Sequence, residues 1–541
     1  MVMMGTAFAA ELNIGTRFYT KFLDRNTLDP SRYATTGNGV GIRSELELTL
    51  SGKVSDRAEM GARILSVWAP SGITPDYSDW AGWYNGDANL WQVRGMWLRF
   101  RPATIPTLNS VLLGSTDLGM FNPWTIGKIR WIDRDNARII LGEGQIGKAK
   151  YNVGMSPLPS YLGTGWSTGP NPRRGWIYGT TLAVALNPAL NLKLTASRVL
   201  AQQEDLTPPT DEAKALNRFD NNVETVELLF QPRPNLNINC LGALTNYSAD
   251  KALIGAVQGW WPRIPYDNVV GGALKIMAIA DDPFGVGLTL KGEAFDVNKN
   301  FVSIAAARRE TNVLLSEGHI RYGVNVNGST WKDDVGFVPS AHVDNGITDW
   351  NETNYQNCIG LKGLTVVPEF RRGALGLKGE VSYIQNGMNS QSIDTTRYFW
   401  SAAKIDQSWT LMALRADYLV PFKNGLNVFA KYKSYNMADG VDTTISTDNL
   451  SSADTEIYAG ATYQLTDEIG LTGGYKTMTY VDKLQDTKTS DSSLGMVFAE
   501  VKANVGGVDM GLAYEKIDGK ENVSSTPVKD MRLKATVEVK I

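Results

Sequence analysis

The sequence predicts an all-β fold: a closed antiparallel transmembrane β-barrel of about 22 strands, within a range of roughly 18 to 24. Three observations predict it. Runs of about ten residues alternate between apolar and polar side chains. Short turns and long polar loops follow one another along the chain. No apolar run reaches the roughly 18 residues that a transmembrane helix needs.

The stretch GIRSELELTLSGKVSD (41–56) shows the alternation that defines each strand. Arg43, Glu45 and Glu47 occupy every second position, and leucines fill most of the positions between them. Successive side chains of a strand point to opposite faces, so this stretch has one charged face and one apolar face. Similar runs recur to the C-terminus, whereas 88–101, 136–143 and 222–230 do not alternate cleanly.

The connections differ in length at the two ends of the expected strands. Tight turns rich in Pro, Asn, Asp and Gly are expected at 54–57, 187–189, 232–235, 281–285, 421–425 and 466–468. Long polar loops are expected at 69–88, 157–175, 202–221, 248–270, 386–408 and 437–455, and the longest at 297–355. Short periplasmic turns and long outer loops are typical of outer-membrane barrels.

A barrel also explains where the apolar face of each strand lies. Closure removes the sheet edges and pairs every backbone polar group inside the hydrocarbon. The apolar faces, such as Leu46, Leu48 and Leu50, are then expected to contact lipid, and the charged faces to line the lumen. Propellers or tandem sandwiches remain soluble alternatives, but no repeat of constant length is present.

Composition and the N-terminus place the chain in the cell envelope. The first ten residues, MVMMGTAFAA, are interpreted as the remnant of a secretory signal peptide, followed by a single barrel domain over 11–541. With 53 basic and 56 acidic residues, the net charge of −3 gives no electrostatic case for a nucleic-acid partner. The two cysteines, Cys240 and Cys358, are not in any paired-motif spacing.

Two segments carry a family resemblance. LLGSTDLGMFNPWTIGKIRWIDRDNARIILG (112–142) resembles the part of porins where a strand ends and a loop folds inward, and IRSELELTLSGKVSDRAEMGARI (42–64) is similar to early strands of the large putative-porin and alginate-export-like families. The resemblance implies a Gram-negative outer-membrane barrel. One departure is the terminal Ile541, where many such barrels end in Phe.

The charged positions of the cleaner strands are the candidate pore-lining residues. They are mixed in sign and predict a polar, wet lumen without strong ion selectivity. Lys378 and Glu380 are expected to meet Arg415 and Asp417 on the next strand. The full set is Arg43, Glu45, Glu47, Arg63, Lys291, Glu293, Lys378, Glu380, Arg415, Asp417, Lys431 and Lys433.

A candidate constriction loop follows from the resemblance to porins. Residues 118–135 are expected to fold into the lumen, with an outer cap as the alternative. Its charged candidates are Lys128, Arg130, Asp133, Arg134 and Asp135.

No catalytic or metal constellation emerges from the residues. The only two histidines, His319 and His342, lie in the long loop without a partner pattern, and no haem-attachment CxxCH occurs. No enzyme activity and no cofactor are therefore predicted. Acidic loops at 344–354 and 438–454 offer oxygen ligands for Ca²⁺ but lack the EF-hand spacing, so solvated loops are favoured.

Two functional hypotheses follow. The first is an outer-membrane channel for passive diffusion of ions or small polar solutes. The alternative is a barrel sheath that holds a partner protein, such as a periplasmic multihaem cytochrome or lipoprotein, because so wide a lumen must be filled by something. Outer-membrane lipid is a partner in both hypotheses, and homo-oligomers stay open.

Overall fold

The computed structural model describes residues 11–27, 39–68, 90–116, 118–126, 137–157, 175–202, 218–249, 268–298, 300–303, 305–306, 361–386, 408–421, 425–438 and 450–540. Strands dominate these ranges, and no helix within them is long and apolar enough to span a membrane. The signal-peptide remnant expected at 1–10 lies outside them.

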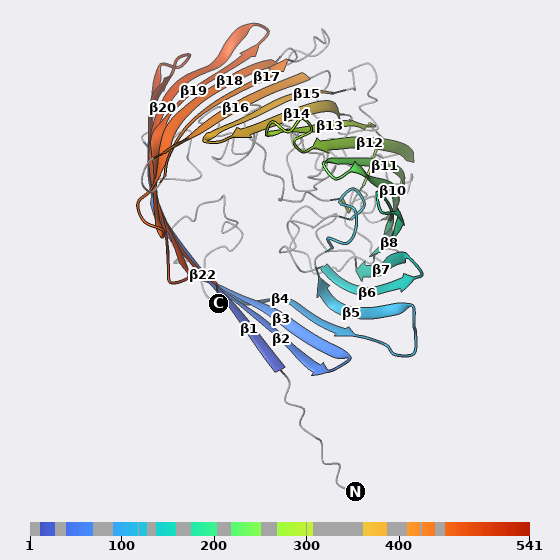
Figure 1. Ribbon diagram of the computed structural model, residues 1–541. Helices are drawn as coiled ribbons and strands as arrows, with labels where there is room; N and C mark the ends of the chain where they lie inside the picture. Colours follow the sequence, from blue (N-terminus) through green and yellow to red (C-terminus); the bar gives the residue numbers. More distant parts are fainter. Residues whose placement is uncertain are drawn as a thin grey trace, which may run out of the picture.

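Twenty-two strands follow one another along the chain and form a ring (Figure 1). They are β1 (Glu11–Thr27), β2 (Gly39–Ser55), β3 (Ala58–Trp68), β4 (Leu90–Phe100), β5 (Leu108–Thr116), β6 (Ala137–Ile146), β7 (Ala149–Pro157), β8 (Gly175–Asn187), β9 (Leu190–Gln202), β10 (Arg218–Arg233), β11 (Leu236–Ala249), β12 (Val269–Ala280), β13 (Leu288–Val297), β14 (Leu361–Arg372), β15 (Leu375–Asn386), β16 (Ser408–Val420), β17 (Leu426–Ala438), β18 (Leu450–Gln464), β19 (Ile469–Leu484), β20 (Thr487–Val505), β21 (Val508–Glu521) and β22 (Thr526–Lys540).

Each strand pairs antiparallel with its neighbours in the sequence, and β1 pairs with β22 to close the ring. The closing register places Tyr19 opposite Glu538, and Arg17 Nε donates to the Glu538 carboxylate at 2.6 Å across this junction. The predicted closed antiparallel barrel, and its predicted strand number, are confirmed.

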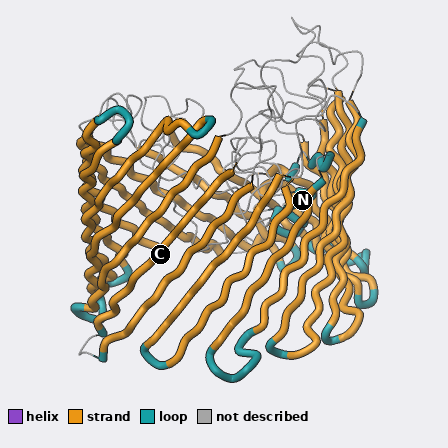
Figure 2. The backbone as a smooth tube through the Cα atoms, turned by 90° about the horizontal axis from the view of Figure 1, so that it is seen from above, coloured by secondary structure: helices purple, strands orange, loops and turns teal. Residues whose placement is uncertain are grey.

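Short turns line one end of the barrel. Figure 2 shows the tilted strands joined by these turns along one rim. They include Asp56–Arg57, Gly147–Lys148, Pro188–Ala189 and Gly506–Gly507. Gly147, Gly506 and Gly507 have positive φ angles of 59°, 59° and 83°, which glycine adopts without the steric penalty of a Cβ. The predicted sidedness of the connections is confirmed except at β19–β20 and β21–β22, which are joined by the short turns 485–486 and 522–525 at the other end.

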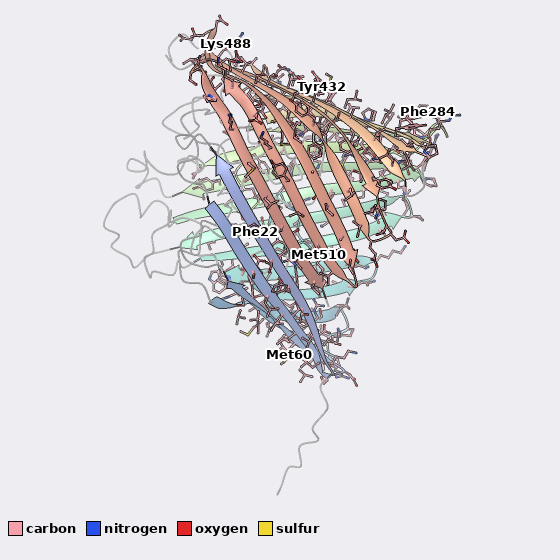
Figure 3. The ribbon with its side chains drawn as sticks, turned by 90° about the vertical axis from the view of Figure 1, so that its left-hand side faces the viewer. Phe22, Met60, Phe284, Tyr432, Lys488 and Met510 are labelled. Atoms are coloured by element: carbon pink, nitrogen blue, oxygen red, sulfur yellow. The ribbon has the colours of Figure 1, made fainter. Side chains whose placement is uncertain are left out.

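Side-chain alternation gives the barrel two chemically different faces. The outward positions carry large apolar side chains that are exposed, among them Leu12, Ile14, Met412, Leu414 and Ile457. Figure 3 shows the outer side of the wall, with Phe22 on β1 and Met510 on β21. The inward positions carry the charged pairs and buried polar groups, together with buried apolar side chains, so it is the apolar outer surface that is the reverse of a soluble protein's.

Candidate functional site

The inner face of β14 to β19 carries a group of charged side chains that we call the charged wall. Strand pairing brings all of them except Asp417 into two neighbouring rows, because Lys378 lies opposite Arg415, Arg415 opposite Lys431, and Lys433 opposite Glu456. The members are Glu369, Lys378, Glu380, Arg415, Asp417, Lys431, Lys433, Glu456 and Lys476.

Glu369 joins three strands at the start of the charged wall. Its Oε1 lies 2.9 Å from Lys291 Nζ on β13 and 2.8 Å from Lys378 Nζ on β15. Two cations on one carboxylate leave this site with a net positive charge. Glu369 was not among the predicted pore-lining residues, and Pro368 directly before it is a residue type that strand interiors seldom contain.

The pairing predicted between β15 and β16 is wrong. Lys378 lies opposite Arg415 and pairs with Glu369, while Arg415 forms a two-pronged ion pair with Asp417 of its own strand, both contacts at 2.8 Å. The physical reason is geometry: residues two apart on one strand share a face, and the Arg415 fork matches that spacing. Glu380 is fully buried, and its Oε1 accepts a 3.4 Å bond from Ser382.

An aromatic stack lies next to Arg415. The rings of Phe429 and Tyr458 are 5.3 Å apart, and those of Tyr458 and Phe498 are 4.7 Å apart at an interplanar angle of 10°. The Arg415 guanidinium lies 5.7 Å from the Phe429 ring. These contacts hold the guanidinium in place by packing as well as by charge.

The far end of the charged wall holds two lysines around one carboxylate. Glu456 lies 2.9 Å from Lys476 Nζ and 3.9 Å from Lys433 Nζ, and each of the three side chains is at most 7% exposed. Lys431 is on the same face one row away, and within the described part of the chain no carboxylate comes within ion-pair distance of its Nζ. The charged wall therefore carries an excess of positive charge.

Other predicted pore-lining residues also form inward pairs. Arg63 on β3 binds both carboxylate oxygens of Glu47 on β2, at 2.5 and 2.8 Å. Glu45 lies 4.0 Å from Arg17, and Glu293 lies 3.3 Å from the buried Lys275. The backbone of Arg43 pairs with that of Lys21, and its side chain is outside the described set.

A segment after β5 enters the lumen and packs on the inner wall. Phe121, Trp124 and Ile126 are almost completely buried. A Cβ placed on Gly179 of β8 would lie only 2.6 Å from Ile126 Cδ1, so the absence of a side chain there lets the segment approach. Figure 1 shows residues 118–126 inside the ring beside β8 to β10.

A second segment, residues 300–303 with 305–306, lies beside the first. Asn221 Nδ2 on β10 donates to the carbonyl of Val302 at 2.9 Å, and Thr245 Oγ1 on β11 donates to the same carbonyl. Ser303 Oγ donates to the Trp124 carbonyl at 2.6 Å, which ties the two segments together. We call the inner face beneath them the neutral wall: Gly154, Gly179, Ser197, Asn221, Thr245 and Gly271.

Several predicted site residues fall outside the described ranges. They are the five candidates of the constriction loop, Lys128, Arg130, Asp133, Arg134 and Asp135, together with most of the two acidic loops. The described beginning of the constriction loop, 118–126, does fold inward. Among the described residues no cluster of three or more His, Cys, Asp or Glu side chains could hold a metal ion.

Comparison with known proteins gives similarity to solved structures alone. No family model and no curated protein matches the chain. OpdK of Pseudomonas aeruginosa, solved with vanillate, is similar over 98% of this chain and 99% of its own, with 8% identity and a TM-score of 0.37. OccK9 (OpdG) of the same organism has 8% identity and a TM-score of 0.41 over 98% and 99%. A BenF-like porin from Pseudomonas fluorescens Pf-5 has 10% identity and a TM-score of 0.39, over 98% of this chain and 99% of its own. We draw no argument from likeness at this level.

Proposed function

We propose that this protein is an outer-membrane channel through which ions and small polar solutes diffuse. The observation that carries the proposal is the inverted polarity of the closed barrel: apolar side chains face outward and paired charges face inward. An apolar outer band suits hydrocarbon, and a closed ring satisfies the backbone there.

The two inward segments support a channel over a sheath for a partner protein. Residues 118–126, 300–303 and 305–306 occupy space along the inner wall that a partner in the lumen would need. They are bound to the wall by buried hydrogen bonds from Asn221, Thr245 and Ser197, so displacing them would leave polar groups without partners.

The positive excess of the charged wall supports a finer proposal, a mild preference for anions. Lys431, Arg415 and Lys378 stand in adjacent register positions along one row. A row of cations in a wet pore raises the local concentration of anions and lowers that of cations. The candidate loop residues Arg130 and Arg134 are proposed to add to this field.

Single-channel recording of the purified protein in a planar lipid bilayer tests the proposal. We expect discrete, stable steps of current, with a reversal potential in a KCl gradient that indicates an excess of chloride over potassium permeation. Replacing Arg130 and Arg134 by alanine should shift the selectivity toward cations. Correctly folded protein that conducts no current would overturn the channel.

A further inference from the structure

The ladder between β4 and β5 is incomplete. Their register runs from Phe100↔Val111 to Trp97↔Gly114, whereas β4 pairs with β3 on its other side from Phe100 to Leu90. Residues 90–96 thus have a strand partner on one side, and the described residues supply none on the other. No other neighbouring pair of strands in the described sheet has so short a register.

Gly114 is the point where β5 leaves β4. Residues other than glycine rarely adopt its φ angle of +119°. A Cβ there would also collide with the carbonyl oxygen of Met96. Beyond Gly114 the chain continues along β6, where Ser115 lies opposite Arg138, and then turns into the lumen at the buried Leu118. The incomplete ladder is therefore built into the backbone.

The unpaired stretch lies at membrane depth. Counted from the short-turn end, the paired part covers Trp97–Phe100, about 13 Å of strand at roughly 3.3 Å per residue. A tilted strand needs about 9 to 11 residues to cross the hydrocarbon, so residues 90–96 lie within it or near its outer boundary. Val93 and Met96, on the outward face, are 58% and 62% exposed.

The inner side of the same place is apolar. The Trp97 indole lies over Gly61 of β3, because a Cβ on Gly61 would be 2.6 Å from its Cε2 atom. Trp97 packs against a buried cluster that contains Leu112, Ile139 and Leu141. Elsewhere in the described sheet a hydrogen-bonded ladder separates lipid from lumen, whereas here two apolar surfaces lie on either side of a strand edge to which the described residues add no partner.

We propose that the β4–β5 seam is a lateral portal, through which an amphipathic solute with a single acyl chain passes between the lumen and the outer part of the bilayer. The apolar chain contacts Val93, Met96 and Trp97. The open edge of β4 supplies backbone N–H and C=O groups that hydrogen-bond the amide or hydroxyl groups of the solute, which satisfies groups that hydrocarbon would leave unpaired.

The direction of the β4 strands argues against a second copy of the barrel at this edge. Two barrels related by a twofold axis along the membrane normal would present their β4 strands in parallel. All pairings in the described sheet are antiparallel, and each copy would meet the other through the exposed side chains of a curved wall rather than edge to edge. An acyl-chain solute requires no such alignment.

The proposal rests on the membrane location proposed above and adds an activity to it. Cross-linking tests it in a background with Cys240→Ser and Cys358→Ser. One pair, Met96→Cys with Ser115→Cys, continues the register one step beyond the ladder. The control pair, Leu98→Cys with Leu113→Cys, joins residues that are already partners. Each variant is reconstituted in liposomes, and its solute flux and ion conductance are measured before and after treatment with a short bis-thiol cross-linker.

The probe is radiolabelled N-decanoylglycine, with N-acetylglycine as the short-chain control and protein-free liposomes as the baseline. We expect the 96–115 link to lower protein-dependent decanoylglycine flux about tenfold because it closes the open edge. Acetylglycine flux and ion conductance should not change, and the 98–113 link should change none of the three.

Equal decanoylglycine flux with and without the 96–115 link would overturn the portal, as would flux no greater than in protein-free liposomes. The link could instead abolish the transfer of phospholipid between the two leaflets and leave decanoylglycine flux unchanged. That result would assign the seam to membrane lipid and overturn the portal. Absent conductance in every variant would refute the channel and leave the portal measurement valid.

Hydrogen exchange on the unmodified protein provides a second test that needs no variant. Amides in 90–96 should exchange faster than those in 58–67 of β3, which has strand partners on both sides. Equal protection of the two segments would mean that the seam is closed, and would overturn the proposal.

Discussion

The neutral wall and the charged wall line the same lumen and are built from the same kind of strand, yet they solve opposite problems. The neutral wall is covered by the chain itself, so its inward positions are small or uncharged: Gly179, Asn221, Thr245 and Gly271. In the charged wall the side chains neutralise one another's charge, through the carboxylates of Glu369, Asp417 and Glu456. Inward-facing positions are thus set by what covers them, and the pattern of a single strand does not show this.

The charged wall is most easily broken at Glu456. Glu456→Gln should lower the free energy of unfolding by about 3–5 kcal/mol, because Lys433 and Lys476 would remain buried beside a neutral group. Urea titration of the barrel in lipid vesicles measures this change. The matched control is Glu500→Gln, whose partner Lys502 is 72% exposed, with an expected loss of about 0–1 kcal/mol. Equal losses for the two variants would show that the lumen screens both sites alike.

The neutral wall is most easily broken at Gly271. A Cβ there would collide with the backbone of Asn300 and Phe301, which cannot rotate away as a side chain would. Gly271→Ala should therefore cost about 1–3 kcal/mol of unfolding free energy and loosen residues 300–303. Gly242→Ala on β11 is the control, because its Cβ would meet nothing within 4 Å. Limited proteolysis of the folded barrel reports the loosening, and resistance equal to that of the control would contradict it.

Lys431 tests whether the charged wall acts on ion flow rather than on stability. Lys431→Gln removes a cation that has no ion-paired carboxylate among the described residues, so the chloride-to-potassium permeability ratio should fall about twofold. Reversal potentials in a KCl gradient give the ratio. Lys502→Gln, near the short-turn end of the same inner face but paired with Glu500, should change the ratio less. A ratio unaffected by Lys431→Gln would place the ion path away from the charged wall.

The smallest effect is expected on the outside of the barrel. Arg198 and Asp220 form a two-pronged ion pair at 3.0 and 2.6 Å between β9 and β10, but Arg198 is half exposed. Arg198→Ala should change the unfolding free energy by only about 0–1 kcal/mol. The same urea titration measures it. A loss as large as that of Glu456→Gln would mean that location inside the lumen does not decide the strength of these pairs.

Much of the fold could be predicted from the sequence because the two faces of each strand differ so strongly in polarity. The three stretches that alternated poorly have physical explanations. In β4, a bulge opposite Arg63 and Ile64 adds a residue and shifts the phase of the alternation. In β6, Ile139 is buried under the inward segment while Ile140 faces outward, so both faces are apolar. In β10, Val223 is buried on the inner face while Val226 is exposed on the outer face, so both faces are again apolar.

The site was harder to predict than the fold, because strand patterns give the face of a residue but not its partner. Lys378 and Arg415 were expected on inward faces, yet Glu369 and not Asp417 compensates Lys378. The Trp97 indole packs on the inner wall over Gly61 of the neighbouring strand, a contact that alternation along one strand does not reveal. The long-range contact between Trp124 and Ser303, 179 residues apart, leaves no local signal at all.

The junction of β1 with β22 has a consequence for how the barrel assembles. Every other seam joins neighbours in the sequence and can form as a local hairpin, but Arg17 and Glu538 are separated by 521 residues. Until these two strands meet, the sheet carries two open edges, which hydrocarbon penalises by several kcal/mol for each unpaired group. Insertion into the bilayer and closure of the ring should therefore occur together, with the first strand kept available until the last one arrives.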